Sequence, residues 1–126
     1  MNKEDLLWIV GFYEGEGSCG FYPTGRGYYK LLVRITQLEP DVLVYIQKTL
    51  GYGRVREHPN GVTKAGEAKR VSIWICESKV ARTFLTQILP FVKSPYKRRQ
   101  IEKALASDRT GTPNARGSVY VTTPNI

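Results

Sequence analysis

The stretch Ile-Val-Gly-Phe-Tyr-Glu-Gly-Glu-Gly, residues 9–17, decides the fold of this chain. It closes a run of apolar residues at helical spacing, which predicts an amphipathic helix over residues 4–17 with Gly17 as its stop. Gly11 and Gly15 lie four residues apart and therefore share one face of that helix. Because neither carries a side chain, a second helix can approach this face at backbone distance.

Two carboxylates, Glu14 and Glu16, stand at the carboxyl end of the same predicted helix. The helix macrodipole is negative there, so each carboxylate is unfavourable by about 0.3–1 kcal/mol. A bound divalent cation would offset this effect, because hard cations take carboxylate oxygens. The two side chains point about 200° apart around the helix, so only one of them can line a seam along the glycine face.

The rest of the chain predicts two hairpins and three further helices. Strands are expected over 18–24, 28–37, 53–58 and 69–76. Helices are expected over 41–50, from Ser78 to Leu89 and over 96–106. This order predicts an α+β fold in which helices cover one face of four antiparallel strands. We place the domain in residues 1–106 and expect 107–126 to form an extension, either flexible or docked.

Alternation along the strands predicts one apolar face and one basic face. The inward set is Cys19, Phe21, Leu31, Val33, Ile35, Val55, Val71, Ile73 and Ile75. The outward set is Tyr22, Tyr28, Lys30, Arg34, Arg54, Arg56, His58, Arg70, Ser72 and Trp74, with Leu32 as its aliphatic exception. This set contains no Asp or Glu, and its members are side chains that reach phosphates and base edges. The pattern favours a nucleic-acid-binding face over an ordinary solvated one.

Composition points the same way. The chain has 126 residues and carries 19 Lys and Arg against 11 Asp and Glu, a net charge of +8. Such a charge is drawn to phosphate backbones, with a role in solubility alone as the alternative. No apolar run approaches the ~18 residues of a membrane helix. Two Cys and the lack of a signal-peptide pattern favour an intracellular protein without a disulfide framework.

Residues 9–17, followed by Ser18, resemble the nine-residue motif of the LAGLIDADG homing endonucleases. Further matches lie where that family places them, at residues 35–37, 50–55, 90–92 and 97–100. The resemblance covers about residues 5–105. It implies an αββαββα core whose curved sheet forms a DNA-binding saddle.

A single motif copy implies the homodimeric branch of that family. The first helices of two copies would pack at Trp8, Gly11, Phe12 and Gly15. Glu16 matches the family position that binds the catalytic metal, where Asp is the consensus, and the Gly15 carbonyl would assist it. Glu14 matches the family's structural acid.

The resemblance implies a site-specific endonuclease that makes a Mg²⁺-dependent double-strand break in a long DNA target, in intron homing, with short 3′ overhangs. Mn²⁺ would substitute, Ca²⁺ would support binding without cleavage, and no organic cofactor or membrane is involved. Gln37 would order the water network. Lys97 would stand beside the scissile phosphate, although its alignment leaves the choice among Lys97, Arg98 and Arg99 open. The DNA-binding residues would be Ser18, Tyr22, Thr24, Arg26, Tyr28, Lys30, Arg34, Arg54, Arg56, His58, Lys69, Arg70, Ser72, Trp74, Arg98 and Arg99.

Three alternatives remain at this point. One is an RNA-splicing maturase that keeps the fold and loses cutting, which the retained Glu16 disfavours. Another is a non-cleaving binding module, because residues 51–55 faintly resemble an RNA-recognition strand. The third is a purely structural dimer, which would not need acids at the end of a helix. Cys19 and Cys76 are expected in the core, and His58 alone is no zinc site.

Overall fold

A computed structural model describes residues 1–62 and 68–106 of the chain. The helices are α1 (Lys3–Glu16), α2 (Pro40–Leu50), α3 (Ser78–Ile88), the 3-10 turn η1 (Leu89–Phe91) and α4 (Pro95–Ala106). The strands are β1 (Gly17–Pro23), β2 (Tyr29–Gln37), β3 (Arg54–Val62) and β4 (Ala68–Glu77). The predicted α+β order is confirmed. Strand β3 runs beyond the predicted 53–58, and the predicted extension over 107–126 lies outside the described residues.

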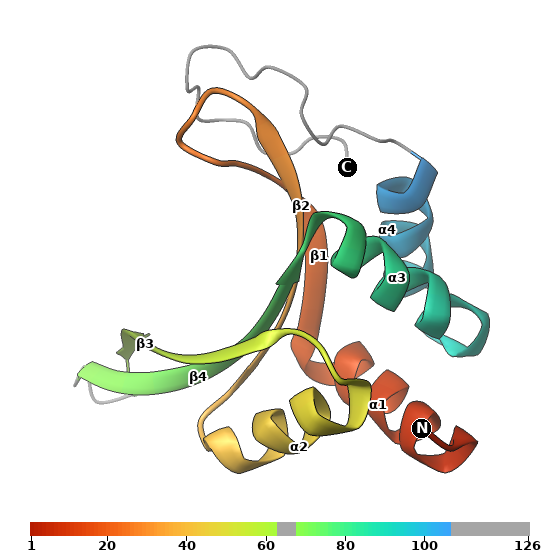
Figure 1. The fold of residues 1–126 in the computed structure, drawn as a ribbon, viewed down its shortest axis with the longest axis horizontal. Coiled ribbons are helices and arrows are strands. Elements are labelled where there is room, and N and C mark those ends of the chain that lie inside the picture. Colours follow the sequence, from red (N-terminus) through yellow and green to blue (C-terminus); the bar gives the residue numbers. More distant parts are fainter. Residues whose placement is uncertain (63–67, 107–126) are drawn as a thin grey trace.

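The four strands form one antiparallel sheet in the order β1-β2-β4-β3. The sheet curves strongly, and the four α-helices all lie on its convex side (Figure 1). The concave face opens away from them. In the described part of the chain, no helix combines the length and the apolar character needed to cross a membrane.

Local signals explain where α1 begins and ends. The Asn2 side chain caps its start by accepting a hydrogen bond from the Asp5 N–H at 2.8 Å. At the other end, the Gly17 N–H donates to the Tyr13 carbonyl while the chain turns extended and enters β1 directly. A Cβ atom at Gly17 would lie 2.3 Å from a ring carbon of Tyr13. The helix therefore passes into the sheet through a position that only glycine fits.

We expect Gly17→Ala to lower the free energy of unfolding by about 1–3 kcal/mol, because the fully buried Tyr13 ring has no room to move aside. Urea denaturation measures the change. Ser18→Ala is the matched control at the next position, where the expected change is below about 0.5 kcal/mol. Equal stability of the two variants would contradict the tight junction.

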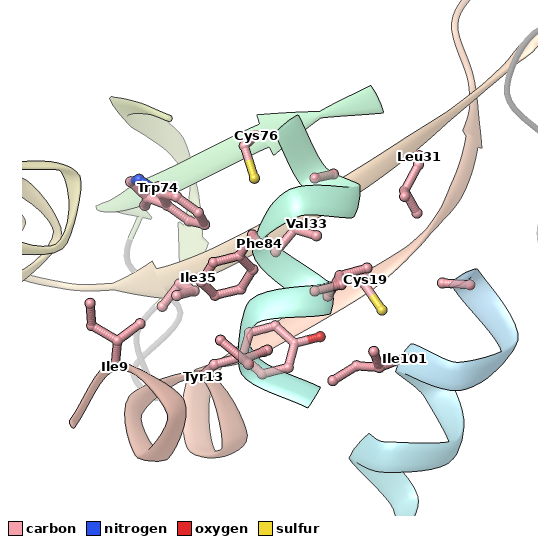
Figure 2. Packing of buried hydrophobic residues seen from close by; sticks show 14 of the residues in the cluster. Ile9, Tyr13, Cys19, Leu31, Val33, Ile35, Trp74, Cys76, Phe84 and Ile101 are labelled. Atoms are coloured by element: carbon pink, nitrogen blue, oxygen red, sulfur yellow. The ribbon is translucent and has the colours of Figure 1, made fainter. Parts of the chain in front are cut away.

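The core lies between the convex face and the helices (Figure 2). The Phe84 ring from α3 stands 5.7 Å from the Tyr13 ring and 5.1 Å from the Trp74 ring, measured between centroids. Cys19 and Cys76 are buried and free, as predicted for small core residues. Burial raises the pKa of both thiols, that of Cys76 to about 12. The cysteines are therefore neutral packing groups.

The predicted facing of β4 is wrong. Ser72 is 2% exposed and Trp74 is fully buried, whereas both were expected to face outward. The register pairs Trp74 with the core residue Ile35, which turns Val71, Ile73 and Ile75 to the concave face instead. Both alternating sets of this strand contain large apolar residues, so the pattern fits either face.

Two contacts explain why the indole ring takes the inner side. Its Nε1–H donates to the Tyr52 carbonyl at 3.2 Å, which satisfies the ring's one polar group inside the protein. The Gly53 backbone lies against the same ring, and a Cβ atom there would come within 2.2 Å of the indole nitrogen. The residues that enter β3 thus form the pocket that receives Trp74.

Candidate nucleic-acid interface and metal site

The register of the sheet defines which side chains share the concave face. Directly paired residues of antiparallel strands point to the same side. Arg34 pairs with Ser18 on one side and with Ile75 on the other, and Ile75 pairs in turn with Arg54. Extending these pairs along the strands places on this face the predicted DNA-binding residues Ser18, Tyr22, Lys30, Arg34, Arg54 and Arg56. The sheet therefore gathers a basic surface on the side that the helices leave open.

Arg34 stacks over the ring of Tyr22, with 5.5 Å between the guanidinium carbon and the ring centroid. An aromatic ring holds the guanidinium plane through a cation–π contact and leaves the N–H donors at its edge available. Such a fixed fork is the group that reads guanine bidentately in a major groove.

The concave face also carries an acid, contrary to the prediction that it has none. Glu77 pairs with Leu32 across the sheet, so its carboxylate lies on the concave side. Its two oxygens stand 3.1 Å from Lys30 Nζ and 3.1 Å from Arg54 Nη2. Burial acts to raise the pKa of Glu77, but the hydrogen bonds and charges of Lys30 and Arg54 outweigh it and hold that pKa below its ordinary value. The group is therefore an ionised carboxylate among the bases.

Three predicted DNA-binding residues lie in the turn between β1 and β2. Thr24 Oγ1 accepts from the Arg26 N–H at 3.0 Å, and the Thr24 N–H donates to the Tyr28 carbonyl at 2.9 Å. The turn is held by its own backbone and stands beyond the helices (Figure 1). Of its side chains, those of Arg26 and Tyr28 are exposed and that of Thr24 is half-buried.

Other predicted contacts lie elsewhere. Arg70 alternates along β4 with Ser72 and Trp74, so it lies on the opposite side of the sheet from Arg54. Its Nη1 forms an ion pair with Glu57 Oε1 at 3.2 Å. Ser72 and Trp74 are in the core, so they are wrong as DNA contacts. The side chains of His58 and Lys69 lie outside the described part of the structure.

The end of α1 brings predicted catalytic groups together. Glu16 is its last residue and is exposed, as is Gly15. Lys97 from α4 reaches the same junction, where its ammonium donates to the Gly17 carbonyl and lies 5.6 Å from the centroid of the Tyr13 ring. A carboxylate and an ammonium from distant parts of the sequence therefore flank the point where α1 becomes β1.

The neighbours of Lys97 in the basic run take different positions. Arg98 donates to the Val92 carbonyl and is engaged within the chain, which does not favour its predicted contact with DNA. Arg99 is exposed. Of the three, Lys97 is the residue with a contact to the α1–β1 junction.

Glu14 and Gln37 both have backbone partners. Glu14 accepts from the Lys93 N–H, which confirms its predicted role as an acid that makes structural hydrogen bonds. Gln37 ends β2, and its Oε1 accepts from the Leu38 N–H at 2.9 Å. Because Ile35 pairs with Gly17, the end of β2 lies beside the α1–β1 junction.

The donor set at Glu16 suits magnesium. Within residues 1–62 and 68–106, no three His, Cys, Asp or Glu side chains gather as a metal site. Mg²⁺ usually binds through one or two carboxylates plus waters and substrate phosphates rather than inside an all-protein cage. An exposed carboxylate beside the free carbonyls of a helix end fits that mode.

The predicted dimer face of α1 is open. Leu7 and Trp8 are each 43% exposed, and a Cβ atom at Gly11 or Gly15 would meet nothing within 4 Å. Phe12 is half-buried, and its ring centroid lies 5.5 Å from that of Trp8. The helix thus presents exposed small and apolar residues to solvent on this face.

The fold is that of the LAGLIDADG homing endonucleases. The archaeal intron-encoded homing endonuclease I-Vdi141I, complexed with DNA, superimposes with a TM-score of 0.56 and 24% identity over 79% of this chain and 64% of its own. The LAGLIDADG meganuclease I-AabMI, bound to uncleaved DNA, superimposes with a TM-score of 0.61 and 19% identity, over 81% of this chain and 34% of its own. The meganuclease I-SmaMI, bound to uncleaveable DNA, superimposes with a TM-score of 0.55 and 18% identity, over 81% of this chain and 35% of its own.

A sequence relative points to the same class. It is named "Probable intron-encoded endonuclease 4" and comes from Neurospora crassa, with 46% identity over 52 residues, or 40% of this chain and 9% of the relative. No family model matches the chain. The chain spans less than two thirds of the length of each of these proteins.

Sequence reasoning missed Glu77 and the apolar pair Ile73 and Ile75 as members of the concave face. A signal for them exists in the sequence, because all three share one parity of β4. If Trp74 is placed in the core, the alternation of the strand puts Ile73, Ile75 and Glu77 together on the concave face.

Proposed function

We propose that this chain is one subunit of a homodimeric, site-specific DNA endonuclease that acts inside the cell. The observation that carries the proposal is the α1–β1 junction, where Glu16 ends α1 and Lys97 donates to the adjacent Gly17 carbonyl at the start of a sheet with a basic concave face. DNA lying on that face would pass over this junction. The DNA-bound state of the similar solved structures and the intron-encoded relative support the same reading.

The concave face has the form needed to follow duplex DNA. A two-stranded antiparallel ribbon fits the major groove, and this sheet joins two such ribbons edge to edge through β2 and β4. Lys30, Arg34, Arg54 and Arg56 supply the positive charge. Phosphate contacts would fix the register, while groups held in place, such as Arg34 on Tyr22, would read bases.

Each subunit would hold Mg²⁺ with the Glu16 carboxylate and the Gly15 carbonyl. When bound, the metal lowers the pKa of a coordinated water and stabilises charge on the leaving 3′ oxygen. Lys97 would stabilise negative charge on the scissile phosphate from the other side of the junction. Gln37, at the adjacent end of β2, would orient water. The products expected are double-strand breaks with short 3′ overhangs.

Two subunits are needed because each chain provides one such junction. The Gly11 and Gly15 face would bring two α1 helices together at backbone distance, with Trp8 and Phe12 at the flanks. Both copies of Glu16 would then lie near the two-fold axis. A dimer would also carry twice the +8 charge of the chain.

Gly11→Leu is expected to weaken dimerisation by about 30-fold or more while leaving the subunit folded. A Cβ atom at this position would meet nothing within 4 Å on its own chain, so we expect the added side chain to obstruct a partner helix instead. Sedimentation velocity over a concentration series measures the shift, with circular dichroism as the check on folding. Lys103→Leu, at an exposed position of α4, is the control. A wild-type chain that stays monomeric at all concentrations would contradict the dimer.

The activity is tested by selecting duplexes from a random pool in Ca²⁺ and then replacing Ca²⁺ with Mg²⁺. The expected result is selection of a long, nearly palindromic target that is cut on both strands only after the exchange. Selective binding without Mg²⁺-dependent breaks would sink the nuclease proposal and favour a non-cleaving module. Preference for structured RNA over every duplex would favour the maturase alternative.

A further inference from the structure

Glu77 is placed where an acid is least expected on a DNA-binding surface. It ends β4 in the middle of the sheet, and its side chain points to the concave face. One oxygen accepts from Lys30 on β2 and the other from Arg54 on β3, both at 3.1 Å. A single carboxylate therefore ties together basic residues from the two strands that flank its own.

This arrangement restrains cations that would otherwise move freely. Lys and Arg side chains are long and flexible, and on an open surface they follow the nearest phosphates whatever the base sequence. Lys30 and Arg54 are 31% and 57% exposed at their side chains but are anchored at their tips. Donors held in this way can meet only bases that present acceptors at matching positions.

The carboxylate itself remains available to a ligand. The Glu77 side chain is 26% exposed, and each of its oxygens uses one of its acceptor positions on a basic partner. An ionised carboxylate repels phosphate and carbonyl oxygens, while it accepts a hydrogen bond from the exocyclic amino group of cytosine in the major groove. Its chemistry therefore discriminates between bases rather than adding general affinity.

We propose that Glu77 is a specificity-determining residue: with Lys30 and Arg54 it forms one unit that reads adjacent base pairs, Glu77 accepting from a cytosine amino group and the two cations donating to guanine. The inference rests on the proposed function, in that the concave face must bind duplex DNA. It predicts that each half-site contains a G·C-rich step under this unit.

Glu77→Gln tests the proposal, with Glu57→Gln as its matched control. Glu57 forms an ion pair with Arg70 at 3.2 Å, but on the opposite face of the sheet. Each substitution removes one negative charge from a strand of the same hairpin. Glu77→Gln removes the two ion pairs with Lys30 and Arg54, and Glu57→Gln removes the one with Arg70. Exposed ion pairs contribute little to folding, so both variants are expected to fold, as circular dichroism would verify.

The measurements are the affinities for the selected target and for random duplex over a range of salt concentrations, and a repeat of the selection with each variant. For Glu77→Gln we expect discrimination between target and random duplex to fall about tenfold or more. Binding to random duplex should tighten, and the slope of log K against log salt should steepen by about 1–2 per subunit as the freed cations reach phosphates. The repeated selection should lose preference at one or two G·C pairs of each half-site.

Three outcomes would overturn the inference or its basis. Unchanged discrimination in Glu77→Gln, or an equal loss in Glu57→Gln, would remove Glu77 from target reading while the nuclease proposal stands. If Glu77→Gln binds all duplexes more tightly with unchanged base preferences, Glu77 affects DNA binding only through its charge. A wild-type chain that selects no duplex at all would instead overturn the proposed function itself.

Discussion

Glu16→Gln is expected to reduce DNA cleavage in Mg²⁺ by about 10³-fold or more while selective binding in Ca²⁺ is retained. The substitution exchanges the exposed carboxylate at the end of α1, which we propose as the metal ligand, for a neutral amide of the same size. Loss of one preorganised contact to the transition state commonly has an effect of this size. Binding should persist because Glu16 belongs to the helix end and the basic side chains of the concave face are untouched.

The chain offers a close control for this experiment. Glu14→Gln removes the same charge two positions earlier, and the amide oxygen can still accept from the Lys93 N–H. We expect this variant to keep cleavage within about tenfold of the wild type. Glu16→Asp should cleave DNA much faster than Glu16→Gln, because Asp is the consensus of the motif that residues 9–17 resemble. Full activity in Glu16→Gln, or equal losses in both Gln variants, would exclude Glu16 as the metal-binding acid.

Trp74→Ala is expected to lower the free energy of unfolding by about 3–5 kcal/mol, the range for removing a large aromatic side chain from a core. The ring is fully buried, packs 5.1 Å from Phe84 and donates to the Tyr52 carbonyl. Guanidinium denaturation followed by circular dichroism measures the change. The same substitution distinguishes the structure from the outward facing predicted from the alternation of residues 69–76.

Two controls sharpen that result. Trp74→Phe keeps most of the apolar volume and should lose less stability than Trp74→Ala. Ile73→Ala removes the next side chain of β4, on the concave face, and should change stability by less than Trp74→Ala. A stable Trp74→Ala variant with weakened DNA binding would show that the outward facing was right after all.

The fold was largely predictable because its local signals agree with one another. The motif helix, the Gly-rich turns and the two hairpins follow from residue spacing, and the observed order of elements matches them. The facing of β4 was not predictable from alternation, because Ser72, Trp74 and Cys76 compete with Val71, Ile73 and Ile75 for the core. The Gly53 backbone and the Tyr52 carbonyl decide that competition, and both come from another strand entry.

The candidate site divides in the same way. The position of Glu16 follows from the motif, since a helix end needs no tertiary information. The contact of Lys97 with the Gly17 carbonyl depends on how α4 packs against β1, which no local pattern encodes. The concave position of Glu77 was missed for the same reason that Trp74 was misplaced. If the facing of one residue of a strand is assigned wrongly, every other side chain of that strand is assigned to the wrong face of the sheet.

The turn over residues 24–28 has a consequence for how such a protein changes over evolutionary time. Its hydrogen bonds run between its own members, and it stands clear of the helices that enclose the core (Figure 1). Substitutions at Arg26 can therefore accumulate with little penalty to folding, whereas changes near Gly17 or Trp74 cannot. On the proposed function, such chains can change their preferred DNA sequence by substitutions in this turn first, while the α1–β1 junction stays unchanged.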